Sequence, residues 1–265
     1  MKKNIYLIII SAITVICVIA GSFIHLFGYF SREGGIWTGH SIYPWENAES
    51  DTDETVSADK DYGDVNSITV DTSAMDIVFV KGDSVKVSYD GGKKLEPRYS
   101  LKDGHLKITQ SVRSFNFWNS GYRGGRLKVS IPDDAVLKNT EIDNSDGNID
   151  IRDLRSEETV INTSAGDIEI KDSELGRTDI DTSAGNVKAE NSSFTDLNID
   201  ASMGDISVST PQDLSDYSFK MDCSLGDIRL NGQKFGNSYE CTGKTDCSVE
   251  IDSSLGDIEI NSGIK

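Results

Sequence analysis

The sequence predicts an all-β fold, a β-helix or β-roll solenoid with rungs of roughly 19 residues, preceded by one N-terminal transmembrane helix. The main observation is a repeated phrase: apolar, Asp or Asn, small, Ser, any residue, Gly, Asp or Asn, and Ile or Val. Its copies begin at Ile142, Ile161, Ile180, Ile199, Met221 and Ile251. A fixed period of about 20 residues is typical of solenoids, in which each rung buries its apolar edge against the next.

The composition also indicates the β class. Ile, Val, Thr, Ser, Asp, Asn and Gly dominate after residue 30, and helix-period patterns are almost absent, so strands and turns must form the fold. The 265 residues include 44 acidic and 26 basic ones, which gives a formal net charge of -18. This balance argues against nucleic acid or an acidic membrane surface as a partner, because both would repel the chain.

The first 30 residues predict a membrane anchor. Lys2 and Lys3 precede an apolar run from Ile5 to about Phe30, which is long enough to cross a bilayer as a helix. The lysines favour a cytoplasmic N-terminus, so we expect a single-pass protein of the cell membrane with an extracytoplasmic C-terminal domain. A cleaved signal peptide ending near Ala20 is the alternative, although the apolar run continues past that residue.

The remaining chain divides into a linker and a β-solenoid domain. Residues 31–64 are assigned to an acidic stalk, because Asp, Glu, Ser and Thr dominate its second half. Residues 65–265 form the solenoid, with an irregular part over 65–132 and regular rungs over 133–265. In the irregular part, alternating strands are predicted at 85–89 and 127–132, and a hairpin joins 99–101 to 106–109.

The aligned rungs place apolar residues in columns. One column holds Ile161, Ile180, Ile199, Met221 and Ile251. A second column holds Ile149, Ile168, Val187, Ile206, Ile228 and Ile258. Stacking identical positions about 4.8 Å apart buries a continuous apolar interior, with roughly two strands in each turn of the solenoid.

The Ser-x-Gly-Asp/Asn part of the phrase predicts a corner. Gly supplies positive φ, while Asp, Asn and Ser close the turn through hydrogen bonds to backbone amides, so the corner needs no ligand. The alternative is a calcium ladder, because the corners would bring Asp167, Asp205, Asp227 and Asp257 near one another. The phrase lacks the paired glycines of the known calcium roll, and Asn148 and Asn186 interrupt the carboxylates. We therefore predict no metal site beyond these four candidates.

Cysteine and histidine give little indication of chemistry. Cys241 and Cys247 flank a short polar segment and could close a disulfide outside the cytoplasm, although the odd cysteine count leaves the pairing open. A nucleophilic triad needs a histidine, and only His105 lies in the folded part, without a nucleophile motif beside it. Every candidate Asp belongs to the repeated corner, which is what a structural role predicts. We expect no catalytic residue, no cofactor and no enzymatic activity.

The least repetitive part of the domain is an insertion over residues 111–126. It contains four aromatic residues that could form a partner-binding patch, Phe115, Phe117, Trp118 and Tyr122. Loops that interrupt a regular scaffold often bind ligands. The alternative is that these residues cap the open N-terminal end of the solenoid.

The repeats of the Ile-Asp-Thr-Ser-Ala-Gly-Asn-Val type, the strand that ends in Ile131-Pro132, and the N-terminal membrane helix resemble the bacterial putative-adhesin family of β-strand-repeat proteins. The resemblance covers about residues 65–262. It implies a β-helical extracytoplasmic domain without catalytic residues, and some members lie beside envelope-stress signalling systems of Gram-positive bacteria.

These observations predict a non-enzymatic structural or interaction role at the bacterial cell envelope. Beyond its own membrane span, the expected partner is an envelope protein or cell-wall glycan, and not nucleic acid. Three alternatives remain: a regulatory or accessory component of an envelope-stress signalling system, a calcium-binding adhesin, and a polysaccharide-active enzyme.

Overall fold

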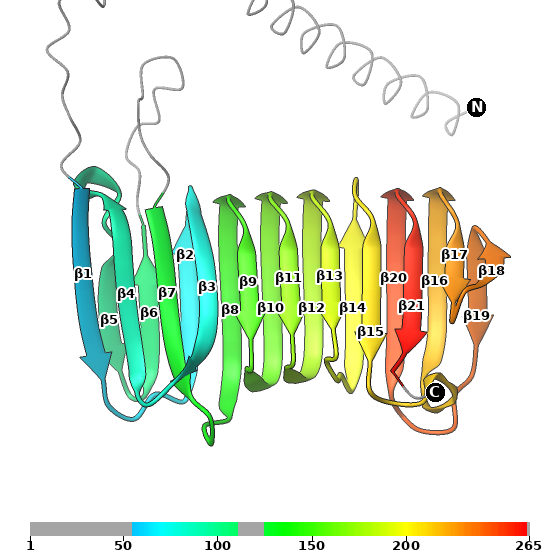
Figure 1. Cartoon of the computed structure of the whole chain (residues 1–265), viewed down its shortest axis with the longest axis horizontal. Helices are drawn as coiled ribbons and strands as arrows, with labels where there is room; N and C mark the ends of the chain where they lie inside the picture. Colours follow the sequence, from blue (N-terminus) through cyan, green and yellow to red (C-terminus); the bar gives the residue numbers. More distant parts are fainter. Residues whose placement is uncertain (1–54, 111–124, 264–265) are drawn as a thin grey trace, which may run out of the picture. The chain divides into compact units, whose positions relative to one another are not determined.

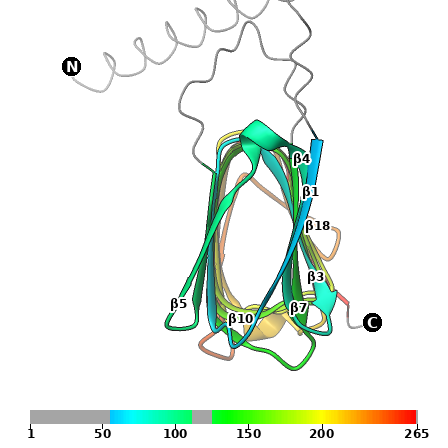
Figure 2. The same ribbon diagram turned by 90° about the vertical axis from the view of Figure 1, so that its left-hand side faces the viewer.

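Two long β-sheets face each other in the computed structural model, which describes residues 55–110 and 125–263 (Figure 1). Seen along the solenoid axis, the sheets enclose a narrow, flattened interior (Figure 2). The described residues contain no α-helix, only the 3-10 turns η1 (Lys93–Leu95) and η2 (Leu214–Asp216). The all-β solenoid is therefore confirmed.

Sheet A has eleven strands, which follow one another in space from the N-terminal end of the solenoid. They are β1 (Thr55–Tyr62), β4 (Val85–Gly92), β7 (Gly125–Pro132), β3 (Met75–Gly82), β9 (Ile149–Arg152), β11 (Ile168–Lys171), β13 (Val187–Glu190), β15 (Ile206–Thr210), β21 (Ile258–Ser262), β17 (Ile228–Leu230) and β18 (Gln233–Gly236).

Sheet B has ten strands, which follow one another in the same direction. They are β5 (Arg98–Lys102), β6 (His105–Thr109), β2 (Ser67–Thr72), β8 (Leu137–Asp146), β10 (Arg155–Ala165), β12 (Glu174–Ala184), β14 (Asp196–Ala201), β20 (Ser248–Leu255), β16 (Ser218–Leu225) and β19 (Ser238–Cys241).

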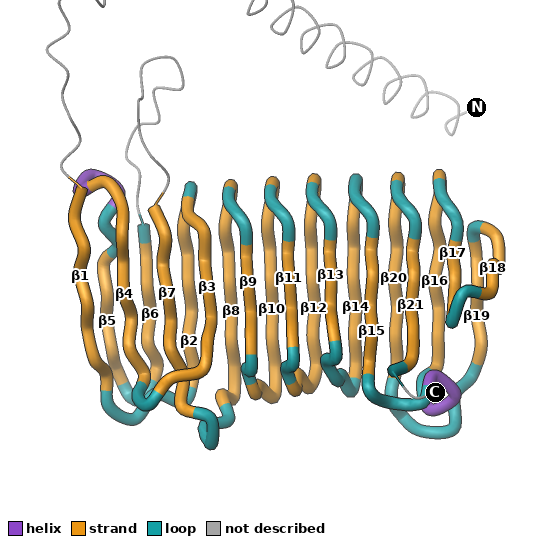
Figure 3. The backbone as a smooth tube through the Cα atoms, viewed as in Figure 1, coloured by secondary structure: helices purple, strands orange, loops and turns teal. Residues whose placement is uncertain are grey.

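Alternation along each strand builds the core between the sheets. On β12, for example, Thr178, Ile180 and Thr182 are buried, and the residues between them point outward. Ile161, Ile180 and Ile199 pair in register across neighbouring strands, each at most 2% exposed. The predicted apolar columns are thus present. Each regular rung has one strand in each sheet, as Figure 3 shows for β8 with β9 and β10 with β11.

The rungs do not stack in the order of the sequence. At the C-terminal end, β20 and β21 lie between the rung of β14 and β15 and the rung of β16 and β17. Ile251 therefore lies between Ile199 and Met221 in the first column. At the N-terminal end, β2 and β3 likewise separate β6 and β7 from β8 and β9.

Antiparallel strands close both ends of the solenoid. β1, β4 and β5 run antiparallel to their neighbours at one end, and β18 and β19 do so at the other. β1 is formed by residues that the sequence analysis assigned to the acidic stalk. This strand belongs to the solenoid, because it pairs with β4 opposite the buried Val87 and Tyr89. β4 also continues past the strand predicted over 85–89, through Asp90–Gly92.

Two predicted features lie outside the described residues: the anchor over residues 1–30 and the aromatic residues Phe115, Phe117, Trp118 and Tyr122. In the part of the chain that the structure describes, no helix is long and apolar enough to span a membrane.

Candidate functional site

The corner phrase forms a continuous edge of the solenoid, the upper edge in Figure 1, where each regular rung passes from sheet B to sheet A. Its glycines have positive φ, for example +142° at Gly185. A Cβ on Gly185 would lie 2.0 Å from the carbonyl oxygen of Gly166 in the next rung. Successive corners therefore stack backbone on backbone, which only glycine permits.

The Asp or Asn that follows each glycine links neighbouring corners. The backbone N–H of Asp167 donates to Oδ1 of Asn148 at 2.9 Å, and that of Asn186 donates to Oδ1 of Asp167 at 2.8 Å. The same bond continues through Asp205, Asp257 and Asp227. The side-chain oxygens of this row thus hold one rung to the next, as the structural interpretation of the corner predicts.

Basic side chains neutralise the last two members of the row. Arg229 Nη1 lies 2.7 Å from Asp257 Oδ2, and Lys234 Nζ lies 2.7 Å from Asp227 Oδ2. The hydrogen bond from Arg229 lowers the pKa of Asp257. Among the described residues, no three His, Cys, Asp or Glu side chains converge to hold a metal ion. The calcium hypothesis for Asp167, Asp205, Asp227 and Asp257 gains no support from this geometry.

A polar groove of about 790 Å³ runs beside the corners, on the outer side of sheet B. We call it the corner groove. One bank is a row formed by Asp71, Asp143, Asn162, Asp181, Asp200, Asp252 and Asp222. The other bank is a row formed by Ser73, Ser145, Ser164, Ser183, Ser202, Ser254 and Ser224. The groove crosses seven rungs in a straight line, because each residue is in register with its counterpart on the next strand.

The carboxylates of the first bank are not neutralised. Within the described residues, none of them forms an ion pair, and Asp143 accepts a hydrogen bond of 2.7 Å from Asn162 Nδ2. Partial burial, together with the charges of Asp200 and Asp222, raises the pKa of Asp252. The bank is therefore a line of like charges without ion pairs among the described residues, although Lys220 acts on Asp222 and Asp252 from a distance.

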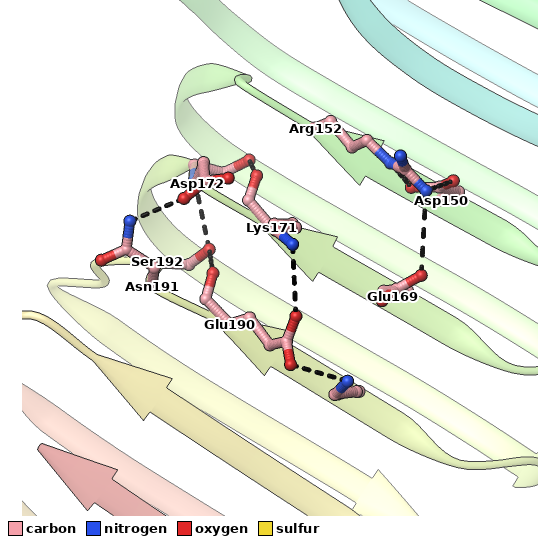
Figure 4. A network of polar contacts seen from close by, with 10 residues as sticks. Asp150, Arg152, Glu169, Lys171, Asp172, Glu190, Asn191 and Ser192 are labelled. Atoms are coloured by element: carbon pink, nitrogen blue, oxygen red, sulfur yellow. Dashed lines mark hydrogen bonds and ion pairs between the residues drawn. The ribbon is translucent and has the colours of Figure 1, made fainter. Parts of the chain in front are cut away.

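The outer face of sheet A is different, as Figure 4 shows. There Arg152 lies 2.6 Å from Asp150 and also contacts Glu169, while Glu190 contacts both Lys171 and Lys188. On this face carboxylates and basic groups form ion pairs both along a strand and between neighbouring strands. The corner groove is thus a feature of one face, and not a general consequence of the acidic composition.

An exposed apolar row, which the sequence did not single out, borders the C-terminal half of the groove. Met203, Leu255 and Leu225 fill the variable position of the corner phrase and are 55%, 45% and 68% exposed. They lie on three successive rungs, since Gly204 donates to the carbonyl of Leu255 and Gly256 to that of Leu225. The sequence does contain an indication of this row: the variable position is Met or Leu in these three copies of the phrase, whereas other copies have Ala or Asp.

The structure brings His105 next to a serine, which the sequence had not indicated. Ser67 Oγ lies 3.0 Å from His105 Nδ1 on the surface of the paired strands β2 and β6. In the described residues no carboxylate hydrogen-bonds to this histidine, and the pair lies outside the corner groove. It therefore lacks the third group that orients a catalytic base.

Cys241 and Cys247 lie at the C-terminal end, on either side of β16. Cys241 on β19 is opposite Phe219 on β16. Cys247 lies just before β20, and its carbonyl accepts a hydrogen bond from the Ser218 amide. Both are half-buried free thiols in the structure, so the disulfide stays a prediction.

Comparison with known proteins gives one family and a set of solved structures. The family model described as Toastrack DUF4097 matches residues 65–263, which confirms the resemblance predicted from the corner phrase. None of the curated proteins matches the chain.

Among solved structures, a putative cell adhesion protein from Clostridium sporogenes is 16% identical, with 79% of this chain and 100% of that chain covered at a TM-score of 0.52. A putative adhesin from Bacteroides fragilis is 12% identical, with 78% and 97% covered and a TM-score of 0.45. A putative adhesin from Parabacteroides distasonis is 14% identical, with 80% and 98% covered and a TM-score of 0.40. The first of these supports the fold.

Proposed function

Because the chain belongs to the Toastrack family of DUF4097 domains, we propose that it is a non-enzymatic interaction module of the bacterial cell envelope, whose corner groove binds an extended envelope glycan. The anchor predicted over residues 1–30 holds the module at the outer side of the cell membrane in this proposal. A non-enzymatic interaction role is also the class of function suggested by the solved structures that are described as adhesins.

The straightness and chemistry of the corner groove support this ligand. Carboxylates accept hydrogen bonds, and serine hydroxyls both donate and accept them, so the two banks suit a ligand rich in hydroxyl groups. Successive rungs repeat every 4.8 Å or so, which is close to the length of one sugar in an extended glycan. A linear polymer along the groove can thus present similar groups to several rungs in turn.

The same repetition argues for binding and not for glycan cleavage. Glycoside hydrolysis needs two carboxyl groups in different environments, one kept protonated as an acid and the other ionised. The groove instead repeats one carboxylate position along its length, on strands held in register, without a second carboxylate row facing it among the described residues.

The proposal is tested by retention of the full-length protein, in detergent micelles, on purified cell-wall sacculi. The variant Asp181→Ala/Asp200→Ala removes two central groove carboxylates, each able to form charge-assisted hydrogen bonds. We expect retention to fall by about tenfold or more.

The matched control is Glu157→Ala/Glu158→Ala, which removes the same charge from exposed positions of β10 outside the groove. This control should be retained like the unmodified protein. Equal retention of the groove variant and the control would show that the groove does not bind the glycan.

A further inference from the structure

Among the described residues, the two ends of the solenoid each leave two strand edges without a neighbour. At the N-terminal end these are β1 in sheet A and β5 in sheet B, and at the C-terminal end they are β18 in sheet A and β19 in sheet B. Within the described residues each of these strands pairs on one side only. Free edges of this kind can pair with another chain unless charges or short strands prevent it.

The apolar interior is also incompletely covered at these ends. Tyr62 and Tyr99 at the N-terminal end pack against the core with buried hydroxyls but are only half-buried as residues, as are Phe235 and Tyr239 at the C-terminal end. The rings of Phe235 and Tyr239 pack against each other at a tilt of 54°, with centroids 4.3 Å apart. Interior residues of the central rungs, such as Ile180 and Ile199, are at most 2% exposed. Half-exposed aromatic side chains are characteristic of protein interfaces.

The charges on the free edges differ in sign within each sheet. In sheet B, β5 presents Arg98 and Lys102, whereas β19 presents Glu240. All three are exposed and have no ion-pair partner among the described residues, since Lys220 opposite Glu240 bonds to Glu250 instead. In sheet A, β1 presents Asp59 and Asp61 and β18 presents Lys234, but Asp59 already pairs with Lys86 and Lys234 with Asp227, so sheet B carries the charge argument. Two like ends would therefore repel in sheet B, whereas unlike ends attract.

The strand directions allow unlike ends to meet. β5 and β19 belong to one sheet and run in the same direction, since each is antiparallel to the parallel strands from β6 to β16. β1 and β18 belong to the other sheet and run in opposite directions. A second copy placed along the axis would continue sheet B with a parallel pair and sheet A with an antiparallel pair.

We propose that copies of this chain associate head to tail, with β1 and β5 of one copy against β18 and β19 of the next. Such an interface joins two different surfaces, so it can repeat into a filament or close into a ring. It uses neither the corner groove nor its ligand, and it stands independently of the proposed function.

A zero-length carbodiimide cross-linker, which condenses a carboxylate and an amine into an amide, tests the contact in the full-length protein in detergent micelles. Lys102 and Glu240 lie at opposite ends of one solenoid, so an amide between them must join two copies. Mass spectrometry of the cross-linked protein should identify this Lys102–Glu240 peptide pair. Its absence, or cross-links that join only like ends, would overturn the proposal.

Charge reversal tests the interface without relying on the cross-link. We expect Glu240→Lys to weaken self-association by about tenfold or more in sedimentation velocity, because it brings a like charge to the basic edge that carries Arg98 and Lys102. The double variant Lys102→Glu/Glu240→Lys should restore both association and the cross-link. Glu157→Lys makes the same change in net charge away from the ends and should associate normally. Equal weakening in that control, or no rescue in the double variant, would contradict a head-to-tail contact.

Discussion

Gly185 illustrates, at the scale of a single residue, why the corner phrase has a glycine at a fixed place. Its φ of +142° is strained for any residue with a Cβ, and the space that a Cβ would occupy is filled by the carbonyl of Gly166. Both costs arise from the close stacking of one corner on the next. The glycines therefore recur at a fixed period because each corner contacts the corner of the next rung at this position.

We predict that Gly185→Ala lowers the free energy of unfolding by about 2–4 kcal/mol, since strain and a backbone clash act together. The measurement is thermal or denaturant unfolding of the variant. Gly63→Ala is the control, because a Cβ at that residue would have no atom within 4 Å, and it should change stability by less than about 0.5 kcal/mol. Similar stability of the two variants would contradict the stacked-corner explanation.

Asp167 shows a second effect at this scale, because its Oδ1 accepts the Asn186 amide. Asp167→Asn keeps a carbonyl oxygen at that place and should leave stability nearly unchanged. Asp167→Ala removes the acceptor and should cost about 0.5–1.5 kcal/mol. Unfolding curves recorded with and without calcium check this: a calcium site would make the Asn variant lose a calcium-dependent stabilisation, whereas a hydrogen-bond ladder would not.

At the scale of the strand, register turns single residues into rows. The sequence predicted the apolar columns because Ile, Val and Met recur at fixed offsets from the corner glycine, for instance in Ile180 and Val187. The sequence also predicted the row of Asp and Asn residues that follow the corner glycines, because they too recur at a fixed offset. The groove was not predicted, because Asp181 and Ser183 belong to the same phrase as the corner, and a phrase does not reveal which face is hollow or unpaired.

Asp252 gives this row a testable dependence on pH. Its pKa is raised in the folded protein by burial and by Asp200 and Asp222, so the folded state takes up a proton more readily than the unfolded state. Stability is therefore lost as pH rises from the ordinary aspartate pKa of 3.8 through the raised value.

Asp252→Asn should consequently stabilise the protein at pH 7 by less than about 1 kcal/mol, since the carboxylate is largely exposed and screened. At a pH well below 3.8 the difference between the variant and the parent should vanish. Melting temperatures recorded across this range are the measurement. A variant that is less stable than the parent at pH 7 would indicate that Asp252 makes a favourable contact there.

At the scale of the whole molecule, the order of the rungs departs from the order of the sequence. Every rung has the same phrase, so Ile199 can pair equally well with Met221 or Ile251, and local pattern cannot choose between them. The choice depends on β18 and β19, which pair antiparallel with β17 and β16 and return the chain so that β20 and β21 enter beside β14 and β15. β1 was missed for a related reason, because its acidic outer side resembles a solvated linker.

This arrangement predicts an unusual effect of truncation. Removal of residues 245–265 deletes β20 and β21 from inside the array, so β16 and β17 lose their parallel neighbours and keep only the antiparallel strands β19 and β18. Amide hydrogen exchange of β16 should accelerate by more than about a hundredfold. Removal of residues 263–265 alone is the control and should leave β16 protected. Unchanged protection of β16 in the longer truncation would mean that its rung does not depend on the inserted one.

The inserted rung also sets a time order for the synthesis of the protein. The other rungs can form as the chain emerges, but the place between β15 and β17 stays open until Ile258 to Ser262 have been made. Until then, the inward side of β16 and both unpaired edges beside the gap are accessible to other chains. A chain that ends near residue 245 would therefore form a solenoid with a gap before its last rung, and not merely a shorter one.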